Sequence, residues 1–506
     1  MASLATQNIA QEARAPIRMS ITLPTLDIQN HYKKPSQQTT PPVTPPISRF
    51  RPETEEICSL RLSDFGPITD DEEPLVAVIG CGYVGTHLIK AFSSCYDVMG
   101  FDVSEIQLAK AEKEFGGPES RAIFTLDPMD LTKATHFLVS VPTLLQADQT
   151  VNTSYIESAL ANIALYARPG STIVIESSVA VGMTRQLVGP LAKQRGFFAG
   201  MSPERVDPGR IEPTMTAIPK IVSGLDDEVP GSLSAIMKLY LLVFDTVIPV
   251  ANPETAEMTK LYENCQRMIN IAYANEMADA CAAHGINPFE VCRAAASKPF
   301  GYMPFTPGLG VGGHCIPVNP YYLMSNNSFP LLQAATESMW QRPAEIGQRV
   351  IDYLLKRPAK VIQKTYRSLP ERTESGSRVS ANERSAYSKN RLNHTTTARS
   401  EHQLQALRRR VLVVGVGFKA GQSTVSNSPG RKLIQKLADS GVVDVAWADA
   451  LVAQSTIPHI PYLSMDQWNR ENLEAFDMII VAFRQTGMDF DILSELRTVK
   501  VEMWCP

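Results

Sequence analysis

The 506-residue chain is predicted to be an α/β protein with two doubly wound, Rossmann-like domains joined by a long central helical region. Continuous apolar runs of strand length occur in two groups, one in the first half of the chain and one near its end. Such runs are expected for parallel strands that are buried on both faces. Helical segments separate the runs within each group, which is typical of doubly wound sheets.

The apolar runs give the positions of the expected strands. In the first group they lie at 75–79, 136–141 and 172–175, and in the second group at 411–414 and 478–482. Each run is short and rich in valine, isoleucine or leucine, as strands of a buried parallel sheet are. Two separate sheets are therefore expected.

A long helical stretch, roughly 253–296, lies between the two groups. It begins with Asn252 and Pro253, a capping side chain followed by a proline in the first turn. Lys260 and Asn264 follow at positions i and i+4, so they share one face of the helix. Taken alone, such a pair is more often a solvated lysine beside an amide than part of a site.

Composition divides the chain into five parts. Residues 1–72 are rich in proline, threonine, glutamine and serine, and 361–408 are polar. Both segments bury too little apolar surface to offset their ordering entropy, so we expect a disordered tail and a flexible insertion. The folded parts are then an N-terminal α/β domain over 73–250, a central helical region over 251–360 and a C-terminal α/β domain over 409–506.

Bulk composition argues against several classes of function. A formal net charge of -4 gives no electrostatic reason to bind nucleic acid or an anionic membrane. Eight cysteines without a Cys-x-x-Cys pair indicate reduced thiols rather than a disulfide framework or a zinc site, and no metal is expected. No secretory signal or membrane-spanning run is visible, so a cytoplasmic location is expected.

The first strand leads into a glycine motif, Gly80-Cys-Gly-Tyr-Val-Gly85, which opens a helix. Glycines let a pyrophosphate approach a helix N-terminus, and Asp102, 22 residues after Gly80, suits a ribose 2′-hydroxyl. A carboxylate there repels a 2′-phosphate, which favours NAD over NADP. A glycine turn without a ligand is the alternative. The expected cofactor-binding residues are Gly80, Gly82, Tyr83, Val84, Gly85, Asp102 and Thr143.

A second glycine-rich segment ends in a thiol. Glycines at 308, 310, 312 and 313 precede Cys315. A thiol in a pocket without side-chain bulk is a candidate covalent nucleophile, whereas a tight turn before a buried cysteine is the ordinary alternative. Lys260 and Asn264 could stabilise the oxyanion that such a nucleophile creates.

Two further loops offer polar groups. Glu204 and Arg205 lie in Ser202-Pro-Glu-Arg-Val206 after an expected strand, and an exposed charged loop is the alternative there. Thr143 ends the segment Ser140-Val-Pro-Thr143 at the carboxyl edge of a strand, where open α/β sheets bind their ligands.

Six motifs occur in one order along the chain, and together they resemble the UDP-glucose/GDP-mannose dehydrogenase family. The resemblance covers nearly everything from residue 74 onward except the polar insertion. Glu204-Arg-Val and Gly-His-Cys-Ile-Pro are similar to the branch of the family that acts on UDP-N-acetylhexosamines. The motifs are Gly80–Gly85, Ser140–Thr143, Ser202–Val206, Lys260–Asn264, Gly312–Pro317 and Gly415–Lys419.

The resemblance implies an NAD-dependent, four-electron oxidation of a UDP-sugar C6 alcohol to the acid, using two NAD molecules. Cys315 would form a thiohemiacetal and then a thioester, Lys260 and Asn264 would stabilise the oxyanion, and Glu204 would act as general base. Thr143 would position water. Substrate contacts are implied for Glu204, Arg205, Lys260, Asn264, Gly312, Gly313 and Lys419.

The resemblance also assigns the parts of the chain. It implies NAD binding by 73–250, a homodimer or higher homo-oligomer formed through 251–360, UDP-sugar binding by 409–506, and a role in polysaccharide biosynthesis. Two positions depart from the family pattern. Asn319 stands where the family has a catalytic aspartate, and an amide cannot accept a proton, so slower turnover is expected. Ser426 stands where the family has an arginine.

Two alternatives stay open. One is a nucleotide-sugar-binding paralogue with impaired catalysis, which Asn319 and Ser426 motivate. The other is a two-electron dehydrogenase of the β-hydroxyacid type, which needs neither a cysteine in a glycine loop nor a second α/β domain.

Overall fold

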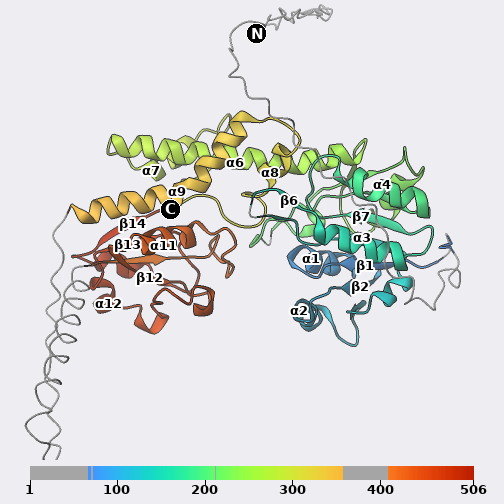
Figure 1. Ribbon diagram of the computed structural model, residues 1–506, viewed down its shortest axis with the longest axis horizontal. Helices are drawn as coiled ribbons and strands as arrows, with labels where there is room; N and C mark the ends of the chain where they lie inside the picture. Colours follow the sequence, from blue (N-terminus) through green and yellow to red (C-terminus); the bar gives the residue numbers. More distant parts are fainter. Residues whose placement is uncertain (1–66, 70–71, 147, 211, 357–407, 506) are drawn as a thin grey trace, which may run out of the picture. The chain divides into compact units, whose positions relative to one another are not determined.

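The computed structural model describes residues 67–505 except 70–71, 147, 211 and 357–407. Most of the expected tail and nearly all of the expected insertion therefore lie outside the described residues. At the N-terminal end of the described residues, the Ile68 N–H donates to Pro169 O at 3.0 Å and Glu72 forms an ion pair with Arg168. The expected fold is confirmed: two separate α/β units each contain a parallel sheet, and helices lie between them in sequence (Figure 1).

The first sheet has eight strands in the order β10-β9-β8-β7-β4-β1-β2-β3. Six of them, from β8 to β3, run parallel to one another, whereas β9 pairs antiparallel with β8 and parallel with β10. The strands are β1 (Leu75–Ile79), β2 (Asp97–Phe101), β3 (Ala122–Thr125), β4 (His136–Val139), β7 (Thr172–Ile175), β8 (Phe198–Met201), β9 (Lys220–Gly224) and β10 (Val247–Pro249). A short hairpin, β5 (Leu144–Leu145) with β6 (Val151–Asn152), follows β4.

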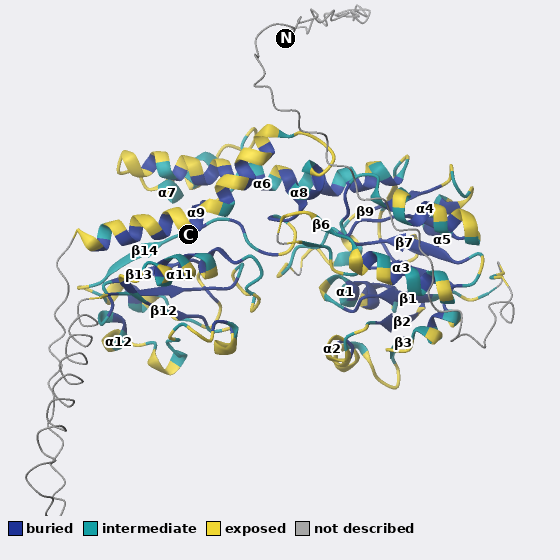
Figure 2. Cartoon of the chain, viewed as in Figure 1, coloured by how far each residue is buried: buried dark blue, intermediate teal, exposed yellow. Residues whose placement is uncertain are grey.

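Two apolar cores cover the two faces of this sheet. One contains Ile156 and Leu160 of α3 with Val188 of α4, and the other contains Leu88 of α1 and Ile236 of α5. The strands are the buried layer between helices that expose their outer faces (Figure 2). The helices are α1 (Tyr83–Phe92), α2 (Glu105–Phe115), α3 (Ser154–Tyr166), α4 (Met183–Arg195) and α5 (Ser232–Tyr240).

The central stretch forms two helices rather than one. Helix α6 covers Pro253–Ala283 and begins as expected, because the Asn252 side chain accepts a hydrogen bond from the Thr255 N–H at 2.9 Å. It ends before Gly285, whose φ of +68° leaves the helical region. Asn287 then caps α7 (Pro288–Ala296). Helices α8 (Asn319–Met324) and α9 (Pro330–Leu355) complete the central region.

The second sheet is fully parallel and has the order β12-β11-β13-β14. Its strands are β11 (Arg409–Val414), β12 (Val443–Ala448), β13 (Met478–Val481) and β14 (Lys500–Met503), and its helices are α11 (Pro429–Asp439) and α12 (Arg470–Glu474). Ile346 and Val350 of α9 share a core with Leu433 of α11 and Val411. Helix α9 is therefore packed against the second sheet's own helix.

Short 3-10 helices occur in the connections, at Pro128–Lys133, Met215–Ala217, Gln454–Thr456, Met465–Gln467 and Asp491–Glu495. Among the described helices, none is long and apolar enough to cross a membrane.

Candidate active site

The first glycine motif forms the turn between β1 and α1. The Gly80 N–H donates to Phe101 O at 2.8 Å, which ties the turn to the end of β2. Gly82 is the N-cap of α1, and a Cβ added there would meet no atom within 4 Å. A Cβ at Gly85 would lie 1.8 Å from Gly80 O. Gly85 is thus required for packing, whereas Gly82 borders open space at a helix N-terminus that can bind an anion.

Asp102 lies beside this turn. One carboxylate oxygen accepts from the Cys81 N–H at 2.7 Å, and the other accepts from the Ser104 N–H at 2.8 Å. The carboxylate is thereby held at the carboxyl end of β2, next to the glycine turn. The structure brings the glycine motif and Asp102 together, in the arrangement that the spacing predicts for an NAD site.

The two hydroxyls of the segment after β4 point to different partners. Ser140 Oγ donates to Gly80 O at 2.9 Å, so it supports the glycine turn. Thr143 lies instead near Tyr322 of α8, which in turn interacts with Cys315. Burial raises the pKa of Tyr322 to about 12, the Thr143 hydroxyl acts in the opposite direction, and a Cys315 thiolate adds to the increase. Tyr322 is completely buried, and no sequence motif indicated it.

Cys315 lies just before α8 and is exposed. Its carbonyl accepts from the Asn319 N–H at 2.9 Å, and the Asn319 side-chain oxygen accepts from the Asn264 amide. Asn264 is 8% exposed and Asn319 is 2% exposed. The position that departs from the family pattern therefore contacts a predicted oxyanion-stabilising residue directly.

Lys260 is buried one helical turn before Asn264. Burial lowers the pKa of Lys260 below its ordinary value, although the charges of Cys315, Glu204 and Glu263 act in the opposite direction. The ammonium thus lies within electrostatic reach of both the thiol and Glu204.

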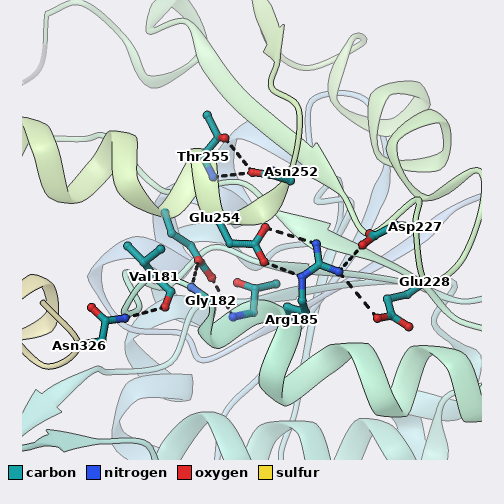
Figure 3. Close-up of polar contacts among 11 residues, drawn as sticks. Val181, Gly182, Arg185, Asp227, Glu228, Asn252, Glu254, Thr255 and Asn326 are labelled. Atoms are coloured by element: carbon teal, nitrogen blue, oxygen red, sulfur yellow. Dashed lines mark hydrogen bonds and ion pairs between the residues drawn. The ribbon is translucent and has the colours of Figure 1, made fainter.

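Contacts between α4 and the start of α6 hold this face in place (Figure 3). The Gly182 N–H donates to Glu257 at 2.6 Å and the Thr184 N–H donates to it at 2.8 Å. Arg185 of α4 pairs with Glu254 at 2.6 Å. Glu257 is 1% exposed and precedes Lys260 by three positions, so the helix face that carries both residues is fixed at the start of α4.

Glu204 lies just beyond β8. One carboxylate oxygen accepts from the Arg205 and Val206 N–H groups at 2.6 and 2.8 Å, and the other accepts from Lys220 Nζ at 2.9 Å. Burial would raise the pKa of Glu204, but Lys220 and Lys260 hold it below its ordinary value. The loop, for which an exposed charged loop was the alternative, thus carries a buried, ionised carboxylate beside Lys260.

Arg205 points to the other side of its loop. Its guanidinium donates to Glu263 and to Pro219 O, the latter at 2.8 Å. It borders a cavity of about 200 Å³ that includes Lys260 and Asn264 in its walls. The remaining lining residues are Val206, Asp207, Glu263, Gln266, Arg267, Asn270, Met303 and Phe305.

Lys419 reaches this loop from the second α/β unit. Its ammonium bonds Asp207 at 3.1 Å and Pro208 O at 3.0 Å. Nearby, the Gly313 N–H donates to Ser426 O at 2.8 Å. The backbone of Ser426 therefore supports the glycine segment before Cys315, although its side chain is not the arginine of the family pattern.

Phe418 explains two glycines of the same segment. A Cβ at Gly312 would lie 3.0 Å from Phe418 Cβ, and a Cβ at Gly313 would lie 2.9 Å from its ring. These glycines allow close approach of the second unit.

Tyr83 has a different place from the other predicted cofactor residues. The pKa of Tyr83 is raised by burial and by the charges of Asp207, Glu204 and Cys315, so its side chain faces Glu204.

Comparison with known proteins identifies two matched regions. Residues 119–243 match the NAD binding domain, and 254–338 match the central domain, of the UDP-glucose/GDP-mannose dehydrogenase family. A UDP-N-acetyl-D-glucosamine 6-dehydrogenase of Pseudomonas aeruginosa is 34% identical over 265 residues, 49% of this chain and 62% of the relative. A UDP-N-acetyl-D-mannosamine dehydrogenase of Pyrococcus horikoshii is 32% identical over 292 residues, 53% of this chain and 69% of the relative.

This chain thus spans less than two thirds of the length of the Pseudomonas aeruginosa relative. Solved structures give wider coverage of the fold. A UDP-D-ManNAc dehydrogenase from Pyrococcus horikoshii has a TM-score of 0.64 at 23% identity and covers 85% of this chain and 99% of its own. A UDP-glucose dehydrogenase from Pyrobaculum islandicum has a TM-score of 0.64 at 18% identity, with 87% and 96% covered.

Proposed function

Because the chain belongs to the UDP-glucose/GDP-mannose dehydrogenase family and carries that family's NAD-binding domain, we propose that it oxidises the C6 alcohol of a UDP-sugar to the carboxylic acid. The UDP-N-acetylhexosamines named for the similar proteins are the first substrates to consider. One observation carries the proposal: Lys260 lies within electrostatic reach of both Cys315 and Glu204. A nucleophile, a cation and a base are thus grouped at one place.

The residues around the first glycine motif fit NAD. The open space at Gly82 and the α1 N-terminus would hold the pyrophosphate, and Asp102 would hold the adenosine ribose. NAD, when bound, accepts the hydride that leaves C6.

Cys315 gives the chain a covalent route. Its thiolate adds to the aldehyde carbon, the aldehyde oxygen takes up a proton, and a thiohemiacetal results. Loss of a proton and transfer of a hydride to a second NAD would convert this adduct to a thioester, and water then releases the acid and the free thiol. Lys260 and the Asn264 amide are placed to stabilise the oxygen that becomes negative in these steps.

Glu204 is suited to the proton transfers. It is ionised, buried and close to Lys260, so it can take a proton from the alcohol or from water. Thr143 lies near Tyr322, and Tyr322 interacts with Cys315, so we propose that the Thr143 hydroxyl orients that water. Asn319 cannot share this work as a base, since an amide accepts no proton at neutral pH.

The direct test is to incubate the protein with NAD and, in turn, UDP-glucose, UDP-N-acetylglucosamine, UDP-N-acetylmannosamine and GDP-mannose. The expected result is two NADH per sugar and a product with the mass of the acid. Cys315→Ser should abolish acid formation and leave NAD affinity unchanged. Acid formation by that variant at the rate of the unmodified protein would eliminate the covalent mechanism.

A second candidate is a nucleotide-sugar-binding paralogue with impaired catalysis. It is favoured by the direct amide-to-amide contact of Asn264 with Asn319. NAD and UDP-sugar binding without NADH from any sugar would support it, whereas steady NADH production would eliminate it.

We also propose that the central helices form a homodimer or higher homo-oligomer. Large apolar side chains are exposed in this region: on α6, Tyr262 is 70% and Tyr273 59% exposed, and Phe300, which follows α7, is 69% exposed. Light scattering at the assay concentration tests this, and a monomer would contradict it.

A further inference from the structure

Three charged side chains meet in the interior behind the active site. Lys220 Nζ lies 2.7 Å from Glu176 and 2.9 Å from Glu204. Glu176 is 1%, Lys220 3% and Glu204 7% exposed. Burying charges is costly unless they are paired and hydrogen-bonded. A cluster of this kind therefore requires a reason beyond stability.

The sheet topology brings the three residues together. Glu176 follows β7 and Glu204 lies just beyond β8, so both are at the carboxyl edge of the sheet. Lys220 is the first residue of β9, and β9 runs antiparallel to β8. The start of β9 therefore lies at the edge where β7 and β8 end.

Further contacts fix the far side of the cluster. Tyr240 of α5 donates its hydroxyl to the second carboxylate oxygen of Glu176. The Phe244 ring lies 5.4 Å from Lys220 Nζ. Glu176 is thus held by one charged and one neutral donor, and Lys220 is enclosed by two carboxylates and an aromatic ring.

The charges around Glu204 come from several elements. Lys220 faces it from β9, Lys260 from α6, and the Tyr83 hydroxyl from α1. Glu176 faces Lys220, Tyr240 and Glu204. Burial raises the pKa of Glu176 to about 7 despite Lys220, whereas the pKa of Glu204 stays below its ordinary value. Of the two carboxyl groups, Glu176 therefore holds a proton more tightly, and Glu204 carries the negative charge at neutral pH.

We propose that Glu176 and Lys220 are positioning residues: Lys220 keeps Glu204 ionised and fixed beside Lys260, and Glu176 holds the Lys220 ammonium in place. This inference rests on the proposed function. Lys220 and two backbone N–H groups fix both oxygens of Glu204, so its carboxylate plane is set before a substrate binds. Such preorganisation is what a general base needs.

The pair also couples Glu204 to pH. When Glu176 loses its proton, the cluster gains a second negative charge and Glu204 becomes a stronger base. Glu176→Gln keeps the shape and one acceptor for Lys220 but cannot ionise. In the unmodified protein, kcat should therefore rise with pH as Glu176 ionises. In Glu176→Gln this rise should be absent, so its kcat at alkaline pH should be lower by about 10-fold.

The test compares the pH dependence of NADH formation from the active UDP-sugar for the unmodified protein, Glu176→Gln and Lys220→Met. Glu257→Gln is the matched control, because it neutralises an equally buried glutamate whose partners are N–H groups of α4. We expect Glu176→Gln to change the shape of the pH profile with the KM for NAD unaltered. Glu257→Gln, which loosens the helix face that carries Lys260, should lower the rate at every pH without changing the shape of the profile. A Glu176→Gln profile that superimposes on that of the unmodified protein would overturn the inference.

A second measurement needs no turnover. The folded protein keeps the Glu176 proton up to about pH 7, whereas the unfolded chain loses it near the ordinary value of 4.5. The folded state binds more protons in this window, so its stability falls as pH rises through it. The melting temperature of the unmodified protein should therefore fall relative to that of Glu176→Gln over this range.

The two measurements separate the possible failures. If the unmodified protein makes no NADH from any sugar, the proposed function fails, and the melting curves still test the charge assignment. Parallel melting curves for the unmodified protein and Glu176→Gln would overturn the inference by themselves. If Lys220→Met does not fold, the isosteric glutamine variant supplies the result.

Discussion

Two glycines of the first glycine motif have different expected roles, ligand approach at Gly82 and helix packing at Gly85, and an added methyl group distinguishes them. Gly82→Ala and Gly85→Ala each add one methyl group, at the N-cap of α1 and in its first turn. At Gly82 the added Cβ meets no atom within 4 Å, and a φ of -73° suits alanine. At Gly85 it would lie 1.8 Å from Gly80 O and 2.9 Å from Ser140 Oγ.

These distances give different expected magnitudes. An ordinary contact at Gly85 would require α1 to move by roughly 1.5 Å, and overpacking of this kind costs about 1–3 kcal/mol or more. Gly82→Ala should change the free energy of unfolding by less than about 0.5 kcal/mol. If a pyrophosphate approaches Gly82, the methyl group of the introduced alanine should still weaken NAD binding by about 10-fold, or roughly 1.4 kcal/mol.

Two assays distinguish the roles. Chemical denaturation gives the free energy of unfolding, and calorimetric titration with NAD gives the affinity. We expect Gly85→Ala to lose stability and NAD affinity together, and Gly82→Ala to lose affinity alone. NAD binding by Gly82→Ala with unchanged affinity would refute the pyrophosphate position, and unchanged stability of Gly85→Ala would refute the packing argument.

Two further substitutions address the substrate side. Asn319→Asp keeps an acceptor for the Asn264 amide and adds a carboxylate near the thiol, so the steady-state rate of NADH formation should rise; an unchanged rate would mean that another group already activates water. Lys419→Met removes an ion pair with Asp207 at 3.1 Å between partly exposed groups, so stability should change by less than about 1 kcal/mol. Its KM for the UDP-sugar should rise with little change in kcat, and an unaltered KM would remove Lys419 from the substrate contacts.

Local patterns in the sequence predicted the elements that depend on local chemistry. The apolar run at 75–79 is β1 with the same bounds, and that at 172–175 is β7. Asn252 caps α6, because a capping side chain acts on the next turn of its own helix. The i to i+4 spacing correctly placed Lys260 and Asn264 on one buried face.

Features that depend on distant pairing were missed. Strand β9 lacks a distinct pattern, and its antiparallel direction depends on β8. Glu176 and Lys220 are 44 positions apart, so neither signals the other in the sequence. The break between α6 and α7 was also missed, although Gly285 and the Asn287-Pro288 pair are ordinary signals for a helix end and a new start.

The departure at Asn319 and the buried cluster behind Glu204 bear on the same question, namely which group supplies the base. Asn319 replaces a carboxylate beside the thiol with an amide that is already bonded to Asn264. In the proposed mechanism, base catalysis then depends on Glu204, whose ionisation depends on Lys220 and Lys260. With an amide at position 319, the charge of Glu204 matters more, and Lys220 preserves that charge. The presence of this cluster therefore favours the proposed dehydrogenase over a protein that only binds its ligands.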